Sequence, residues 1–349
     1  MAATTNALLT GLLKATSRSF YLTLRVLPRR VRPQIGLAYL LARTTDTIAD
    51  TEIVPVQQRL TALQNLRERI LGAGSAALNF GELARQQGSP AERVLLERVG
   101  DSLTTMRALS PDDLKLVREV LDTITSGQEL DLRRFAGASA EKIVALQTDQ
   151  ELDDYAYRVA GCVGEFWTKI CRAHLFPLAP LDDLRLLADG VRFGKGLQLV
   201  NILRDLPVDL RRGRCYLPGI KLSETGLEPA DLLQPSNEKK FRPTYDSYLA
   251  LADSHLAAGW AYTNALPWRC ARLRLACAWP ILIGTRTITR LHTASVLEPQ
   301  RRVKISRAEL RGLILRSVLC YPLPGLWQRL ARLPTDGSGK AVASGPNLT

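Results

Sequence analysis

The chain has 349 residues, of which 46% are hydrophobic and 23% charged, and this composition excludes an intrinsically disordered protein. Its 47 lysine and arginine residues outnumber its 34 aspartate and glutamate residues, which gives a formal net charge of +13. That excess leaves three classes of partner open: nucleic acid, an anionic membrane surface, or a strongly anionic substrate.

Helical periodicity dominates the chain, and no convincing alternating strand pattern is found. The first twenty residues lack a basic start followed by a long apolar run, so we expect no secretory signal. Hydrophobic residues recur at three- and four-residue steps over 60–70, and again over 114–124 after the helix-start sequence at 110–113. Each of these patterns predicts an amphipathic helix.

The second half of the chain predicts further long helices, over 245–265 and 308–333. The most apolar stretch, 275–284, is too short to span a membrane and predicts a helix of the core. Loops are expected where Gly, Pro and Ser cluster, at 72–75, 88–90 and 177–180, with a longer one over 213–243. We predict one all-α domain over 1–333 and a disordered Gly/Ser-rich tail over 334–349.

The six cysteines include no CxxC pair and the three histidines lie far apart, so no local zinc signature is present. A chain of this length can fold without disulfides. We therefore expect reduced, mostly buried thiols.

Two short acidic motifs carry the functional signal: Asp46 with Asp50, and Asp205 with Asp209. A helix stacks carboxylates at i and i+4 on one face, about 6 Å apart along its axis. A single pair of this kind more often lies on a solvated helix face than in a metal site. Both pairs, however, follow strongly apolar stretches, where a carboxylate is costly unless a cation compensates it. Facing each other across a cavity, the four residues would be ligands for Mg2+ and its phosphate partners.

Arginines cluster beside both motifs. Five lie between 18 and 32, Arg204 precedes the second pair, and three more lie at 211–214. Mg2+ together with guanidinium groups is suited to holding a diphosphate and to stabilising it as a leaving group. A single arginine is more often a surface residue, so only the position of these arginines beside the acidic motifs favours a diphosphate site.

Five sequence blocks, in their order and spacing, resemble the squalene/phytoene synthase family of head-to-head prenyl transferases. The similarity covers about residues 13–316. The blocks are Ser-Arg-Ser-Phe at 17–20, the segment from Tyr39 to Asp50, Ser-Gly-Gln-Glu-Leu-Asp-Leu at 126–132, the segment 155–165, and the segment 196–205, which is closed by 211–218.

The resemblance implies an all-α isoprenoid-synthase fold with a central cavity. It implies that Asp46, Asp50, Asp205 and Asp209 bind Mg2+, or Mn2+ in its place, with the prenyl diphosphates. Tyr39 and Tyr155 match tyrosines near the reacting carbons, where a phenol assists proton transfer or stabilises a carbocation, so Tyr39, Tyr155, Asp46 and Asp205 are the expected catalytic residues. Core packing is the other interpretation of both tyrosines. The expected substrate-binding residues are Arg18, Ser19, Phe20, Arg43, Gln198, Asn201 and Arg204.

Three residues depart from the pattern of the family. Pro207 lies inside the second acidic motif, where it removes a backbone donor and is expected to kink or restart the helix before Asp209. Gln128 stands where many relatives carry Met, which is expected to alter the cavity wall. Arg158 occupies the place of a tyrosine considered catalytic in animal squalene synthases, so we place the catalytic role on Tyr39 and Tyr155.

The resemblance indicates the family more clearly than it indicates the product of the reaction. Residues 301–307 resemble a segment whose bases contact NADPH in reductive squalene synthases, so Lys304 and Arg307, with Arg18, Arg43 and Arg204, are the expected NADPH-binding residues. This match and Phe166-Trp167 favour a squalene synthase that joins two farnesyl diphosphates through presqualene diphosphate and then uses NADPH. The alternatives are a phytoene, dehydrosqualene or presqualene diphosphate synthase without a reductive step, with 301–307 as a solvated loop.

Nucleic-acid binding is disfavoured, because the bases are dispersed, aromatic residues make up only 6% of the chain and no recognised motif is present. The segment 313–333 combines Tyr321 and Trp327 with arginines, which suits contact with an anionic membrane. A C-terminal helix packed on the core is the other interpretation. We expect a cytoplasmic enzyme, with peripheral contact at the inner membrane surface, and make no prediction of its oligomeric state.

Overall fold

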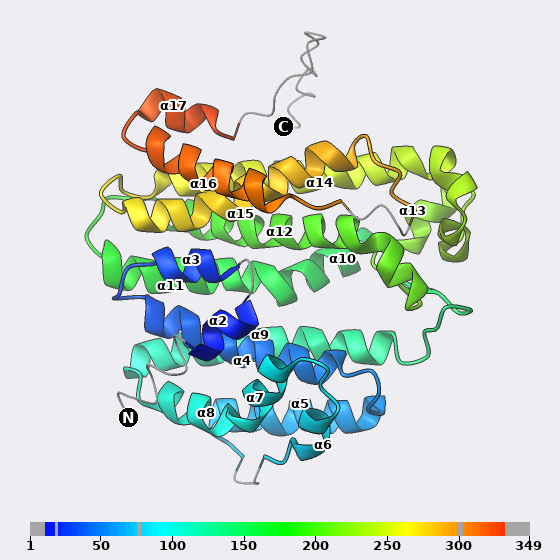
Figure 1. Ribbon diagram of the computed structural model, residues 1–349, viewed down its shortest axis with the longest axis horizontal. Helices are drawn as coiled ribbons and strands as arrows, with labels where there is room; N and C mark the ends of the chain where they lie inside the picture. Colours follow the sequence, from blue (N-terminus) through cyan, green and yellow to red (C-terminus); the bar gives the residue numbers. More distant parts are fainter. Residues whose placement is uncertain (1–10, 18–19, 75–77, 299–302, 332–349) are drawn as a thin grey trace.

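The computed structural model describes residues 11–17, 20–74, 78–298 and 303–331, and most of this part of the chain is helical (Figure 1). The all-α prediction is confirmed. The helices up to the middle of the chain are α2 (Leu13–Ser17), α3 (Phe20–Val26), α4 (Arg32–Asp50), α5 (Val56–Leu71), α6 (Gly81–Arg85), α7 (Pro90–Glu97), α8 (Val99–Arg107), α9 (Pro111–Arg134) and α10 (Asp149–Ala156).

The remaining helical elements begin with a single π-helical turn, η2, that joins α10 to the next helix without a break. They are η2 (Tyr157–Gly161), α11 (Cys162–Leu175), α12 (Asp183–Arg211), α13 (Gly219–Ser223), the 3-10 turns η3 (Pro229–Leu233) and η4 (Pro235–Asn237), α14 (Glu238–Ala265), α15 (Ala271–Leu291), α16 (Arg307–Cys320) and α17 (Pro324–Arg329).

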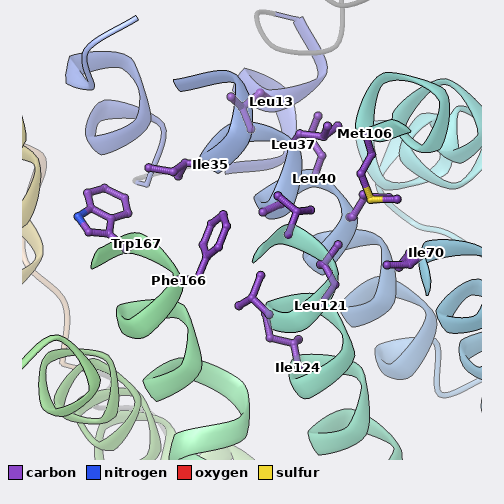
Figure 2. Packing of buried hydrophobic residues seen from close by; sticks show 14 of the residues in the cluster. Leu13, Ile35, Leu37, Leu40, Ile70, Met106, Leu121, Ile124, Phe166 and Trp167 are labelled. Atoms are coloured by element: carbon purple, nitrogen blue, oxygen red, sulfur yellow. The ribbon is translucent and has the colours of Figure 1, made fainter. Parts of the chain in front are cut away.

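The long helices lie roughly side by side in two packed groups (Figure 1). One group is built from α4, α5 and α9, and the other from α12, α14 and α15. Helix α11 joins the groups, because it packs on both α9 and α12. Figure 2 shows the junction: Phe166 of α11 lies beside Leu40 of α4 and Leu121 of α9, and all three are buried. Burial of each such side chain stabilises the fold by about 1.5–3 kcal/mol.

The two helices α11 and α12 approach each other through glycines. A Cβ atom added to Gly164 would lie 1.8 Å from the carbonyl oxygen of Gly190, and one added to Gly194 would lie 2.1 Å from that of Ala160. No side chain fits at such separations, so glycine is required for backbone contact here. The close approach sets the position of α12, which carries the second acidic motif.

Helix α12 continues through Pro207 to Arg211, so the predicted restart of the helix is wrong. A residue with an N–H at position 207 would donate to the carbonyl oxygen of Leu203. The hydroxyl of Tyr245, from α14, donates to that oxygen instead at 3.0 Å. Tyr245 is fully buried, so the neighbouring helix supplies the hydrogen bond that the proline removes, and Asp209 keeps its helical register.

The structure corrects two further predictions. The long loop expected over 213–243 contains strand β2 (Arg214–Cys215), α13, η3 and η4, and α14 already begins at Glu238. Strand β2 pairs in parallel with β1 (Val144–Ala145), a contact too short to show as an alternating pattern. The single helix expected over 308–333 is two helices, because Pro322 and Pro324 interrupt it and the second proline opens α17.

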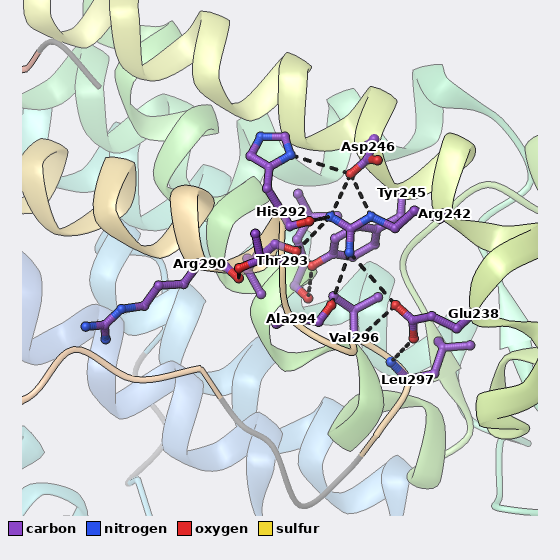
Figure 3. Close-up of polar contacts among 12 residues, drawn as sticks. Glu238, Arg242, Tyr245, Asp246, Arg290, His292, Thr293, Ala294, Val296 and Leu297 are labelled. Carbon is purple, nitrogen blue, oxygen red and sulfur yellow. Dashed lines mark hydrogen bonds and ion pairs between the residues drawn. The ribbon is translucent and has the colours of Figure 1, made fainter. Parts of the chain in front are cut away.

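A polar cluster holds the segment that follows α15 (Figure 3). The guanidinium group of Arg242 donates to the carbonyl oxygens of Leu291 at 2.9 Å and Ala294 at 3.1 Å, and it also pairs with Asp246. The carboxylate of Glu238 accepts from the backbone N–H groups of Val296 and Leu297 at 3.0 and 2.9 Å. These contacts satisfy the carbonyls at the end of α15 and fix the path of the chain beyond it.

No helix in the described ranges is long and apolar enough to cross a membrane. The six cysteines are free thiols, four of them buried, as expected from the sequence.

Candidate functional site

A cavity of about 520 Å³ lies between the two groups of helices. Its wall is polar on one side and apolar on the other. Along α12, Phe193 and Asn201 both line it and are separated by about 12 Å of helix axis, which gives the cavity an apolar and a polar end. The polar end is lined by Asp46, Asp50, Asp131, Gln198, Asn201 and Arg214, and the apolar end by Val163, Trp167, Phe193, Tyr262, Cys277 and Pro280.

The first acidic pair lies at the C-terminal end of α4. Both Asp46 and Asp50 line the cavity. Arg43, one turn earlier, forms ion pairs with Asp46 and with Glu92 of α7, which orients its guanidinium group towards the cavity wall. Burial and the neighbouring Asp50 carboxylate raise the pKa of Asp46, and burial also raises the pKa of Asp50. The pair therefore carries more negative charge than its surroundings compensate.

The second acidic pair lies on the last turns of α12. Gln198 and Asn201 line the cavity, whereas Asp205 and Asp209 follow on the same helix. Asp205 pairs with the adjacent Arg204 at 2.6 Å. Burial and the charge of Asp205 raise the pKa of Asp209 to about 7. As at the first pair, the local cations do not fully neutralise the carboxylates.

Arg214 lies between the two pairs. Its guanidinium group lowers the pKa of Asp50 and of Asp209, although burial dominates at both, so it lies within electrostatic reach of each motif. It pairs with Glu52 at 3.0 Å and stacks over the ring of Phe135 at 6.0 Å. Arg214 also lowers the pKa of Asp131, and Arg212 acts with it on Asp50 and Asp209, so cations and carboxylates alternate at this end of the cavity.

Tyrosines occupy the middle of the wall. Tyr39 of α4 and Tyr155 of α10 both line the cavity. The Tyr39 hydroxyl donates to the carbonyl oxygen of Thr16 at 3.5 Å. Tyr155 is 8% exposed and stacks on Tyr216, with ring centroids 4.8 Å apart. Burial raises the pKa of both stacked tyrosines well above the ordinary value, so their hydroxyl groups stay protonated at neutral pH.

The other sequence-predicted residues lie in different places. Gln128 lines the cavity, as its position in the motif predicts. Arg158 instead pairs with Asp154 at 2.8 Å and Ser126 at 3.0 Å and is not among the lining residues. Lys304 and Arg307 are exposed beyond α15 and do not line the cavity.

The segment at the start of α3 is only partly described. Arg18 and Ser19 lie outside the described residues, and so does the side chain of Phe20.

Two residues of this site, Asp131 and Tyr216, received no role from the sequence, and Arg214 was named there only as one of a cluster of arginines. All three line the cavity, and the Tyr216 hydroxyl donates to Asp131 at 2.9 Å. Their signal was present, because they stand in the blocks 126–132 and 211–218. Pairing them required the fold, which brings the end of α9 to the segment after α12 through the β1–β2 contact.

A metal ion fits the polar end only with further ligands. Within the described ranges, no three His, Cys, Asp or Glu side chains converge as a ready-made metal site. Mg2+ is usually bound by one or two carboxylates plus waters and substrate phosphates, so a preformed protein cage is not needed. The raised pKa values of Asp46 and Asp209 indicate carboxylates that an added cation would stabilise in the charged form.

Comparisons with known proteins point to one family. The family model for squalene/phytoene synthase matches residues 13–309. The bifunctional lycopene cyclase/phytoene synthase of Gibberella fujikuroi is 32% identical over 232 residues, which are 64% of this chain but 37% of that protein. The chain thus spans well under half the length of that relative. The presqualene diphosphate synthase of Rhodopseudomonas palustris is 29% identical over 303 residues, 86% of this chain and 93% of its own.

Two solved structures have a similar fold. A ligand complex of TcSQS matches with a TM-score of 0.71 and 20% identity, covering 93% of this chain and 91% of its own. The squalene synthase HpnC of Alicyclobacillus acidocaldarius matches with a TM-score of 0.58 and 20% identity, covering 82% and 95%.

Proposed function

The chain belongs to the squalene/phytoene synthase family, and on that basis we propose that it is a squalene synthase. It would join two farnesyl diphosphates head to head through presqualene diphosphate and, with NADPH, complete squalene. The observation that carries the proposal is the division of one cavity into an acidic end and an apolar, aromatic end. A prenyl diphosphate has the same division, because a dianionic head group is joined to a hydrocarbon tail.

Each end suits one part of that substrate. Asp46, Asp50, Asp205 and Asp209 would hold Mg2+, or Mn2+, with Asn201 and Gln198 beside them. When bound, the metal neutralises the diphosphate and helps it to leave. Arg43 and Arg214 would hold the phosphate oxygens directly, since guanidinium groups match their geometry.

The apolar end would hold the hydrocarbon tails. Trp167 and Tyr262 present aromatic faces there, and both are buried. Nearer the acidic end, Tyr39 and Tyr155 would face the carbon that loses the diphosphate. A π face stabilises a nearby cation by about 0.5–2 kcal/mol, and a dry wall prevents water from capturing it.

The reductive step is the part of the proposal with least geometric support. Lys304 and Arg307 do not line the cavity, and Arg204 is already paired with Asp205. Of the bases named for NADPH, Arg43 alone lines the cavity among the described residues, and the reductive step rests on the resemblance of 301–307 and of Phe166-Trp167.

A second candidate is a presqualene diphosphate synthase, which omits reduction. Two observations favour it: Lys304 and Arg307 do not line the cavity, and the Rhodopseudomonas palustris relative aligns over 93% of its own length. Phytoene and dehydrosqualene synthases also work without a reductive step and complete the set of candidate activities.

Product analysis distinguishes these candidates. The protein with Mg2+ would be incubated with farnesyl or geranylgeranyl diphosphate, each with and without NADPH, and the extracts analysed by mass spectrometry. Squalene formed from farnesyl diphosphate only when NADPH is present is the expected result. Presqualene diphosphate under both conditions would establish the second candidate. Phytoene from geranylgeranyl diphosphate, or dehydrosqualene irrespective of NADPH, would contradict both.

We also propose that α16 and α17 contact an anionic lipid surface. Five of the twelve exposed large hydrophobic residues lie within this short segment: Leu315, Val318, Leu319, Leu323 and Leu326. Residues 303–331 include five basic residues and one acidic residue, Glu309, which pairs with Arg290. An exposed apolar face bordered by cations suits anionic lipid head groups and acyl chains.

The position of this face fits a hydrophobic product. The indole N–H of Trp279 on α15 donates to the hydroxyl of Ser317 on α16 at 2.9 Å. Cys277 and Pro280 of the same α15 line the apolar end of the cavity. One helix therefore separates the exposed leucines from the place where the hydrocarbon would lie.

Vesicle co-sedimentation tests the lipid contact. Phosphatidylglycerol-containing vesicles are expected to bind the protein, and phosphatidylcholine vesicles to bind it more weakly. The double substitution Leu315→Glu and Leu319→Glu should abolish binding, whereas Leu178→Glu, at a still more exposed site elsewhere, should not. Unchanged binding of the double variant would refute the proposal. The proposal would also be refuted if the protein binds no vesicles but self-associates with increasing concentration, and the double variant loses this self-association. A second copy of the chain would then be the partner of this face.

A further inference from the structure

Three side chains from separate segments form one unit on the cavity wall. Asp131 lies near the end of α9, Tyr155 on α10, and Tyr216 just after β2. The hydroxyl of Tyr216 donates to Asp131 Oδ2 at 2.9 Å, and its ring stacks on Tyr155 at an interplanar angle of 23°. All three line the cavity, and Asp131 belongs to its polar end.

The hydrogen bond in this unit has a fixed direction. An ionised carboxylate only accepts, so the Tyr216 proton is committed to Asp131. The second contact is the stack of the Tyr216 ring on the Tyr155 ring. Because Asp131 fixes the hydroxyl end of Tyr216, it also fixes the ring surface against which Tyr155 packs.

Asp131 holds Tyr216 through one of its two carboxylate oxygens, Oδ2. Its Oδ1 atom is buried and has no hydrogen-bond partner, which is costly for a carboxylate. A buried polar atom without a hydrogen-bond partner is rare in a native fold, and a role in a functional site is a common reason for it.

We propose that Asp131 and Tyr216 are positioning residues for Tyr155. They hold the Tyr155 ring in place, so that its free π face meets the carbocation left when the diphosphate departs. This inference rests on the proposed prenyl transfer. It assigns a role to the block 126–132, which the metal and substrate assignments leave unused.

The chain contains a matched control pair. The hydroxyl of Tyr248 on α14 donates to Asp149 at 2.6 Å, and Tyr248 is 4% exposed against 7% for Tyr216. Neither residue of the control pair lines the cavity. Tyr248→Phe therefore breaks an equally buried tyrosine–aspartate hydrogen bond at a place where no reaction is proposed.

The test measures steady-state kinetics, diphosphate release and organic products for Tyr216→Phe, Asp131→Asn and the double variant with farnesyl diphosphate and Mg2+. Each single change is expected to lower kcat by about 10- to 100-fold and leave KM within about threefold, because binding precedes the positioned step. The double variant should be no slower than the slower single variant, since both changes break one unit. Tyr248→Phe should retain the kcat of the unmodified protein.

The product ratio supplies a readout that loss of stability does not change. If Tyr155 guides the cation after the diphosphate leaves, the variants should release more diphosphate per coupled product, with the difference appearing as prenyl alcohol from capture of the cation by water. Tyr155→Leu, which removes the aromatic ring, should give the same shift.

Two results would overturn the inference while the proposed function stands: an unchanged kcat and product ratio in the Tyr216 and Asp131 variants, or losses in them no greater than in Tyr248→Phe. If the unmodified protein releases no diphosphate from farnesyl or geranylgeranyl diphosphate, the proposed function fails, and this inference with it.

Discussion

The hydrogen bond between Tyr245 and Leu203 should be worth more to this protein than an ordinary one, because it replaces a bond that Pro207 cannot make. Tyr245→Phe removes the hydroxyl and leaves the Leu203 carbonyl buried without that donor. The expected loss in free energy of unfolding is about 1–3 kcal/mol, the usual cost of an unsatisfied buried group. The ring stays in place, so no cavity contributes to the loss.

The proline provides an internal test of this explanation. In Pro207→Ala, the new N–H group can donate to Leu203 as in any helix, and the substitution itself should not destabilise α12. Tyr245→Phe in that background should cost only about 0.5 kcal/mol. Denaturant titrations of the four proteins, followed by circular dichroism, give the coupling energy. Equal costs in both backgrounds would refute the idea that Tyr245 substitutes for the missing donor.

Two further predictions concern stability. Gly164→Ala would place a Cβ 1.8 Å from the backbone of Gly190, so we expect a loss of about 3 kcal/mol or more in denaturant titrations; Gly312→Ala, whose Cβ meets nothing within 4 Å, should be neutral or stabilising. Burial acts to raise the pKa of Asp113, but hydrogen bonds from His174 and Gln34 prevail and lower it. Because its pKa is lowered by folding, Asp113 contributes its full share of stability above the unfolded-state pKa near 4. This contribution is lost as the pH falls through the folded-state pKa. Asp113→Asn should therefore flatten the acid limb of a stability–pH profile, and an unchanged limb would contradict this.

Much of the fold could be predicted from the sequence, because the apolar periodicity of α5, α9 and α15 reports directly on which faces are buried. The same holds for the first acidic motif, whose i, i+4 spacing on an apolar helix places Asp46 and Asp50 together on the cavity wall. These are local properties of one helix.

Contacts between segments could not be predicted. Nothing near Pro207 indicates that Tyr245, 38 positions later and on another helix, supplies the missing hydrogen bond. Asp131 and Tyr216 are separated by most of the middle of the chain and meet only through the fold. The segment 213–243 has the composition of a loop, yet tertiary packing orders it into short helices and a strand.

The proposed function requires the two acidic motifs to act together on one diphosphate. Diphosphate release from farnesyl diphosphate, measured with and without Mg2+, tests this requirement most directly in Asp46→Asn, Asp205→Asn and the control Asp153→Asn, whose carboxylate pairs with Lys195 and is 59% exposed. We expect Mg2+-dependent release that falls by about 100-fold or more in each of the first two variants and is unchanged in the third. Full release by either Asp46→Asn or Asp205→Asn would contradict it.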